Sequence, residues 1–260
     1  MDSVHKPTDS TACSPGFRAW WLGEVDYGEA WRLQQELVTL RQQEAIPDSL
    51  LLLTHPRTIT LGRKSAESHL LGSREQLAAQ GFSIYDVDRG GDVTYHGPGQ
   101  LVGYPIFDLT LHGRDLHHFL RNLEESLILA LAEHGIRGTR LPPHTGVWVD
   151  SHKIAAIGIK VSRWVTSHGF ALNVDSDLAD FANIVPCGIR ERGVTSIAVE
   201  TGLAPEPIDL IPSVTDSVSK VFEAALVPGL PGAERTPALS PESQKILHGA
   251  IDAARIDIVR

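Results

Sequence analysis

A dense run of side chains that can do chemistry occupies residues 89–100 of this 260-residue chain. Its sequence is RGGDVTYHGPGQ, in which four glycines and a proline stand among an arginine, an aspartate, a threonine, a tyrosine and a histidine. Glycine lets the backbone approach a ligand closely and exposes amide donors. A plain turn between strands rarely needs so many polar side chains as well, so we interpret the run as a ligand-binding loop. It is neither a GxxxxGK[ST] phosphate loop nor a GxGxxG fingerprint.

Cys187 is a second candidate. It stands between a proline and a glycine, among turn-forming residues and outside any apolar run. Arg190 and Arg192 follow it, and nearby positive charge favours the thiolate, which is the nucleophilic form. A single cysteine is more often a small buried hydrophobic residue. Sequence context alone therefore leaves a nucleophile and an inert thiol equally open.

Two lysines flank the apolar segment KIAAIGIK at residues 153–160. A lysine at the head of a strand usually points into solvent, but one held beside a thiol can exchange protons with it. Lys153 and Lys160 are seven residues apart, so a regular strand places them on opposite faces unless a bulge intervenes. Lys153 would then share its face with Ala155 and Ile157. Alternation alone does not show which lysine serves a cysteine.

The segment SHGFALNV at residues 167–174 is the fourth candidate. Gly169 and Ala171 are small, so they leave room on a strand for a chain or a flat, plate-like ligand. His168 by itself favours a structural histidine with satisfied hydrogen bonds.

The elements that position these segments mix strands and helices. Periodicity and capping patterns predict helices near residues 26–40, 115–134 and 213–226, and strands near 50–54, 58–61, 82–87, 101–109, 145–149, 154–161 and 166–174. Consecutive strands with separate helices indicate an α/β fold of the α+β kind, with a mixed and largely antiparallel sheet flanked by helices. The regular strand–helix alternation of a doubly wound fold is missing.

Composition and charge limit the possible domain organisation and the class of protein. With 42% apolar and 21% charged residues the chain is globular, and Pro/Gly-rich breaks divide it into a flexible tail (1–16), a folded unit (17–227) and a C-terminal extension (228–260). A net charge of −9 argues against nucleic-acid binding. We find no membrane span and no export signal, and two cysteines make no disulfide framework, so we expect a cytoplasmic protein.

In order along the chain, these segments resemble the octanoyltransferase family. The matching motifs are THP (54–56), LGR (61–63), the 89–100 run, TGVWV (145–149), KIAAIG (153–158), HGFALNV (168–174) and PCGI (186–189). The resemblance covers about residues 17–227. It implies the catalytic fold shared by lipoate and biotin protein ligases.

The resemblance also implies a reaction. An octanoyl group would pass from acyl carrier protein to a lysine of a lipoyl domain, in 2-oxoacid dehydrogenase complexes or in the H protein of the glycine cleavage system. Cys187 would carry the octanoyl group as a thioester, and Lys153 would help to ionise the thiol and move protons. No cofactor or metal is implied, because the acyl group arrives activated. The implied substrate-binding residues are Arg89, Gly90, Gly91, Asp92, Val93, Thr94, Tyr95, His96, Ala156, Ile157, Gly158, Gly169, Phe170 and Ala171.

Three alternatives stay open beside this interpretation. They are an ATP-dependent lipoate or biotin ligase of the same fold, a cysteine hydrolase that pairs Cys187 with His96 or His168, and a non-enzymatic scaffold. An acidic carrier protein would need a local basic rim on this acidic chain. The candidates for that rim are Arg57, Arg63, Lys160, Arg163, Arg190 and Arg192.

Overall fold

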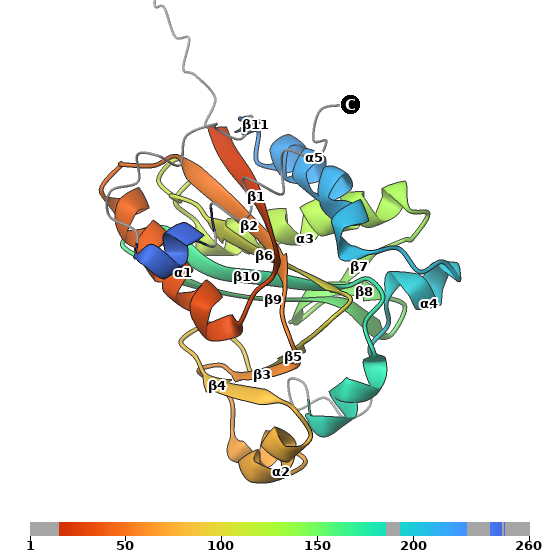
Figure 1. Cartoon of the computed structure of the whole chain (residues 1–260). Coiled ribbons are helices and arrows are strands. Elements are labelled where there is room, and N and C mark those ends of the chain that lie inside the picture. The colour runs from red at the N-terminus through yellow and green to blue at the C-terminus, as the bar shows by residue number, and fades with distance from the viewer. Residues whose placement is uncertain (1–15, 186–192, 228–239, 246, 248–260) are drawn as a thin grey trace, which may run out of the picture.

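The computed structural model describes residues 16–185, 193–227, 240–245 and 247. Within these residues a mixed eight-stranded sheet has the order β11-β1-β2-β6-β10-β9-β8-β7, and a three-stranded sheet has the order β4-β3-β5 (Figure 1). The strands of the large sheet are β1 (Gly16–Glu24), β2 (Asp48–Thr54), β6 (Gln100–Ile106), β7 (Thr139–Leu141), β8 (His144–Val149), β9 (His152–Ser162), β10 (Val165–Asn173) and β11 (Ala225–Leu226). Within the described part of the large sheet, β1 pairs in parallel with β2 and β11, and the other strand pairs are antiparallel. The expected α+β architecture is confirmed.

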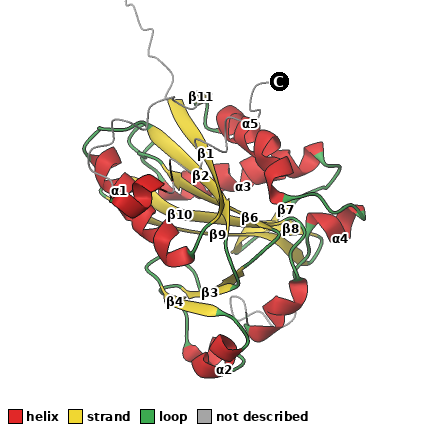
Figure 2. Cartoon of the chain, viewed as in Figure 1, coloured by secondary structure: helices red, strands yellow, loops and turns green. Residues whose placement is uncertain are grey.

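The small sheet and the helices complete the fold (Figure 2). The small sheet contains β3 (Thr58–Leu61), β4 (Ser83–Asp86) and β5 (Val93–His96). The helices are α1 (Tyr27–Gln42), α2 (Arg74–Ala79), α3 (Leu116–Glu133), α4 (Ile197–Thr201) and α5 (Ile211–Val221), with 3-10 turns η1 (Glu67–His69), η2 (Leu178–Asn183) and η4 (Pro207–Leu210).

Strand β2 shows how the large sheet is buried on both faces. Leu50 and Leu52 pack in one hydrophobic cluster with α3 and α5, whereas Leu51 and Leu53 pack in another with α1. Alternating side chains of one strand therefore fill two separate cores. This explains why the sequence reads as a continuous apolar run there instead of an alternating one.

Local signals set the ends of the predicted helices. The Asp26 carboxylate accepts a hydrogen bond from the Glu29 N–H and caps α1, while Asp115 accepts from the N–H groups of His117 and His118 and caps α3. Gly135, with φ of 75°, follows the end of α3. The sequence does not predict strands β1 and β7. The strand predicted over 101–109 ends at Ile106.

Part of the predicted C-terminal extension packs on α1. The Ser240 N–H donates to Glu36 Oε2 over 2.8 Å, and Leu247 is 5% exposed within the hydrophobic cluster of α1. The chain therefore contacts its own first helix again after residue 240.

Candidate active site

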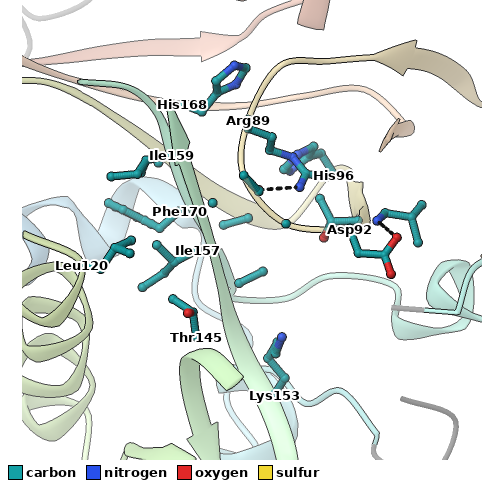
Figure 3. Close-up of a pocket in the computed structure, with 18 of the residues that line it drawn as sticks. Arg89, Asp92, His96, Leu120, Thr145, Lys153, Ile157, Ile159, His168 and Phe170 are labelled. Carbon is teal, nitrogen blue, oxygen red and sulfur yellow. Dashed lines mark hydrogen bonds between the residues drawn. The ribbon is translucent and has the colours of Figure 1, made fainter. Parts of the chain in front are cut away.

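A cavity of about 460 Å³ lies along β9, between the loop that precedes β5, the start of α3 and the β7–β8 turn (Figure 3). Among the strand pairings that the structure describes, β8 pairs with β9 only as far as Ala155. The following stretch of β9 pairs with β10 alone, so the cavity opens at this edge of the strand. The cavity gathers most of the residues named from sequence: Lys153, Arg89, Gly90, Gly91, Asp92, Val93, Thr94, His96, Ala156, Ile157, Gly158, Gly169, Phe170 and Ala171.

Tyr95 is placed elsewhere. Its side chain lies in the core of the small sheet, and its hydroxyl donates to Asp180 Oδ2 over 2.7 Å. Successive residues of a strand point to opposite faces, so His96 faces the cavity and Tyr95 faces away from it. Cys187, Arg190 and Arg192 lie outside the described residues.

Glycines let the 89–94 loop press against its neighbours. The Gly90 N–H donates to the Ile159 carbonyl over 2.9 Å. A Cβ added at Gly158 would lie 2.6 Å from the Gly90 oxygen, and one added at Gly62 would lie 2.6 Å from the Gly91 oxygen. Any side chain at either position would push the loop away. The glycine-rich sequence is thus a requirement of close backbone approach.

The Arg89 guanidinium is built into the wall of the cavity. Its Nη2 donates to both the carbonyl and the hydroxyl oxygen of Thr60, each over 2.9 Å, and the residue is 7% exposed. These bonds hold the positive charge of Arg89 beside the cavity and keep the guanidinium out of bulk solvent.

A β-bulge decides where Lys153 points. Val147 pairs with Ala155, but the next residue, Trp148, pairs with Lys153, so Ile154 is an extra residue on β9. Ile154 and Ala155 consequently both pack in the α3 cluster, while Lys153 Nζ lies 4.8 Å from the ring centroid of Trp148 on the other face.

The expectation from simple alternation is therefore wrong. Lys153 shares its face with Ala156 and Lys160, and not with Ala155 or Ile157, because the bulge adds one residue to the count. The two lysines point to the same face. Their seven-residue separation, about 23 Å along a strand, is what keeps them from sharing one partner.

Lys153 is also fixed through its backbone. Its N–H donates to the Gly193 carbonyl and its carbonyl accepts from the Thr195 N–H, both over 3.0 Å. Gly193 is the first described residue after Cys187, six positions further on.

Lys160 belongs to a different set of contacts. Its Nζ binds Asp88 Oδ2 over 2.5 Å, and His168 Nε2 donates to the other oxygen of the same carboxylate over 2.9 Å. Burial opposes ionisation of Asp88, yet these two hydrogen bonds together hold the pKa of its carboxyl below the ordinary value. Asp88 immediately precedes Arg89, so this ion pair ties the base of the binding loop to β9 and β10.

Four buried rings, which we call the inner wall, line the cavity or support its lining on the α1 side: Tyr27, His55, His96 and Tyr104. The Tyr27 ring stacks on His96 with centroids 5.8 Å apart. His55 binds the Val25 carbonyl through Nδ1 over 2.6 Å and the Tyr104 hydroxyl through Nε2 over 2.7 Å.

Burial keeps the inner wall uncharged at neutral pH. It lowers the pKa of His55 to about 4, and it lowers the pKa of His96 well below the usual value, with further lowering by His55 and Arg89. It raises the pKa of both tyrosines. Sequence reasoning did not find Tyr27 or Tyr104. Tyr27 carried no motif, and its ring reaches the cavity only because α1 packs across β10.

The structure also changes the expected basic rim. Arg57 binds Asp180 and the Gln80 carbonyl, and Arg163 binds the Gln42 side chain. Together with Lys160, these cations are engaged within the protein. Arg63 and Lys64 are exposed, and Lys64 lines the cavity.

Within the described ranges, no group of three or more histidine, cysteine, aspartate or glutamate side chains could hold a metal ion. Of the helices in those ranges, none is long and apolar enough to cross a membrane.

Comparison with known proteins gives a consistent result. The family described as the lipoyl protein ligase A/B catalytic domain matches residues 26–222. An octanoyltransferase of Chloroflexus aggregans is 51% identical over 205 residues, covering 78% of this chain and 93% of that protein. An octanoyltransferase of Rubrobacter xylanophilus is 54% identical over 182 residues, covering 69% and 81%.

Solved structures share the fold at low sequence identity. A lipoate-protein ligase A bound with ATP has a TM-score of 0.69 at 14% identity, over 91% of this chain and 94% of that one. A lipoate protein ligase of T. acidophilum, described as putative and solved with bound lipoic acid, has a TM-score of 0.66 at 16% identity, over 92% and 95%. The likeness to lipoate protein ligases expected for the fold is confirmed.

Proposed function

The chain belongs to the lipoyl protein ligase A/B catalytic-domain family and is an acyltransferase of the octanoyltransferase kind; on that premise we propose that Cys187 carries the octanoyl group as a thioester. The donor is octanoyl acyl carrier protein. The acceptors are lysines of lipoyl domains, in 2-oxoacid dehydrogenase complexes and in the glycine cleavage H protein. The reaction takes place in the cytoplasm.

The position of Lys153 is the observation that carries this proposal. The bulge turns its side chain toward the face on which the small residues Ala156 and Gly158 line the cavity. Its backbone is bonded to Gly193, close in sequence to Cys187. The motif match supplies the nucleophile, and the described geometry supports a proton-transfer partner for it at the mouth of a cavity of suitable size.

The proposed chemistry has two balanced steps. In the first, the Cys187 sulfur attacks the carbonyl carbon of the donor thioester, the bond to the carrier sulfur breaks, and the carrier leaves as a thiol. In the second, the acceptor amine attacks the new thioester, an amide forms and the Cys187 thiol is regenerated. Lys153 takes the proton from Cys187, gives one to the departing carrier sulfur, and then relays the amine proton to Cys187.

The cavity provides binding energy for the acyl chain. An octanoyl group can bury about seven methylene or methyl groups, each worth roughly 0.8 kcal/mol. Arg63 and Lys64 offer exposed positive charge near the opening for an acidic carrier. No ATP is required, because the thioester is already activated.

Intact mass spectrometry tests the proposal. Octanoyl acyl carrier protein without ATP should add one octanoyl mass, removable by neutral hydroxylamine, and Cys187→Ala should remain unmodified. Near-normal transfer by Cys187→Ser would overturn the thioester route. A requirement for free octanoate plus ATP would instead indicate a ligase, and octanoate release without an acceptor would indicate a hydrolase.

A further inference from the structure

We propose that Tyr27 closes the inner end of the cavity and sets the length of acyl chain that the site accepts. This inference rests on the proposed octanoyl transfer. Tyr27 is the first residue of α1, it lines the cavity, and it is 1% exposed. Nothing in the proposed reaction requires a tyrosine at this place.

The path of the chain follows from the faces of the strands. Ala156 pairs with Ala171 and Gly158 with Gly169, so the face of the sheet that carries Lys153 has a stretch of very small residues. The Gly90 carbonyl covers Gly158, where an added Cβ would lie 2.6 Å from it, so the open channel on this face lies over Ala156 and Ala171. The channel begins near Lys153, where the acyl carbonyl must lie for the transfer. It runs across β9 and β10 toward the inner wall.

Tyr27 lies at the far end of this channel. Its hydroxyl is 3.4 Å from His168 Nδ1, next to Gly169, and its ring stacks on His96 from β5. An extended octanoyl chain has seven carbon–carbon bonds of about 1.5 Å, which span about 9 Å with tetrahedral angles. This length is comparable with the distance of about 10 Å that the three residues from Lys153 to Ala156 can span along a strand.

The ring of Tyr27 is held too firmly to swing aside. Besides His96, the rings of Trp31, His55 and Tyr85 lie with their centroids 5.1 to 6.4 Å from it. Its hydroxyl bonds His168, which bonds Asp88, which in turn binds Lys160. A ring packed on several sides acts as a fixed stop for an alkyl chain.

The opposite side of β9 offers a matched control. Figure 3 shows Leu120, Ile157 and Phe170 on one side of the strands and Arg89 and His96 on the other. Leu120 comes from α3, lines the same cavity and packs against the α3 cluster. If the acyl chain follows the small-residue channel, shortening Leu120 enlarges the cavity without lengthening that channel.

The test compares carrier proteins loaded with hexanoyl, octanoyl, decanoyl and dodecanoyl groups, and reads the rate at which each acylates Cys187 by mass spectrometry. For Tyr27→Ala and Tyr27→Leu, the ratio of dodecanoyl to octanoyl rate should rise at least about tenfold, because the added methylenes gain a buried space. Tyr27→Phe keeps the ring and should stay within about twofold of the wild-type ratio. Leu120→Ala should also keep that ratio.

Each outcome decides the matter. A wild-type ratio in Tyr27→Leu, with thermal unfolding showing a folded protein, overturns the inference even if Tyr27→Ala fails to fold. A larger rise in Leu120→Ala than in Tyr27→Leu also overturns it, since the chain then lies on the α3 side. If wild-type protein shows no acylation of Cys187 by any donor, it is the proposed function that fails, and the inference fails with it.

Discussion

Strand β9 carries a lysine near each end, on the same face of the sheet, and the two are used differently. Lys153 lies in the cavity with its ammonium over the Trp148 ring. Lys160 is bound to Asp88, and His168 completes that contact. Residue type and strand face therefore do not assign a role. A lysine bound to a carboxylate positions a loop, whereas a lysine that faces a cavity can exchange protons.

The largest effect is expected at the end of β9 that holds Lys153, and it is an effect on the rate of acylation. Lys153→Ala should slow acylation of Cys187 by about 10²-fold or more, the usual scale for loss of a general acid or base. Single-turnover acylation measured across pH checks this, with Lys160→Ala as the matched variant of the same strand. Full acylation in Lys153→Ala together with none in Lys160→Ala would reverse the two assignments.

The end of β9 that holds Lys160 should give a smaller effect, on binding of the donor and not on the rate of acylation. Asp88→Asn weakens both contacts that tie the base of the binding loop to β9 and β10, so we expect KM for the donor to rise about tenfold, the effect of about 1.4 kcal/mol, with kcat changed little. The measurement is steady-state kinetics, combined with Lys160→Met in a double-mutant cycle. Additive effects would contradict the proposed coupling through one ion pair. The sequence predicts instead that Lys160 belongs to a basic rim and mainly attracts the carrier, in which case the effect of its loss would fade at high salt.

The smallest effect should appear as a pH dependence of stability. Burial lowers the pKa of His55 to about 4 and also lowers the pKa of His96 and His168. As the pH falls below about 6.5, these histidines take up protons in the unfolded chain before they do so in the folded protein. The free energy of unfolding therefore falls as the pH drops from about 6.5 toward 4. Each histidine adds a slope of up to about 1.4 kcal/mol per pH unit.

Urea unfolding at pH 7.5 and pH 5.0 measures this slope. His55→Gln should flatten it, whereas His117→Ala, an exposed position on α3, should not. An equal slope in wild type and His55→Gln would contradict the account of a wall held neutral by burial.

Much of the fold could be predicted because the relevant signals are local. The caps at Asp26 and Asp115 and the apolar face of α3 lie within one helix each. Strand β1 was missed because its sequence, GFRAWWLGE, has no clear alternation, and it becomes a strand through parallel pairing with distant β2 and β11.

The same distinction applies to the site. The motifs identified the loop and the strands that line the cavity. The bulge at Ile154 could not be predicted, because it depends on pairing with β8 and on the bridge between Lys153 and Val194. The inner wall was missed for a similar reason, because its four rings come from separate parts of the sequence. One ring belongs to α1, one to the segment between β2 and β3, one to β5 and one to β6.

The extra residue on β9 has a genetic consequence. Loss of the single codon for Ile154 would remove the bulge, yet Lys153 would still stand opposite Trp148 and Ala155 opposite Val147, so the lysine would keep its face toward the cavity. The cost of the deletion would be one buried apolar side chain in the α3 cluster. A one-codon deletion here should therefore behave like a partial-loss allele with lowered stability and not like a null allele, and most substitutions of Ile154 by other apolar residues should be tolerated.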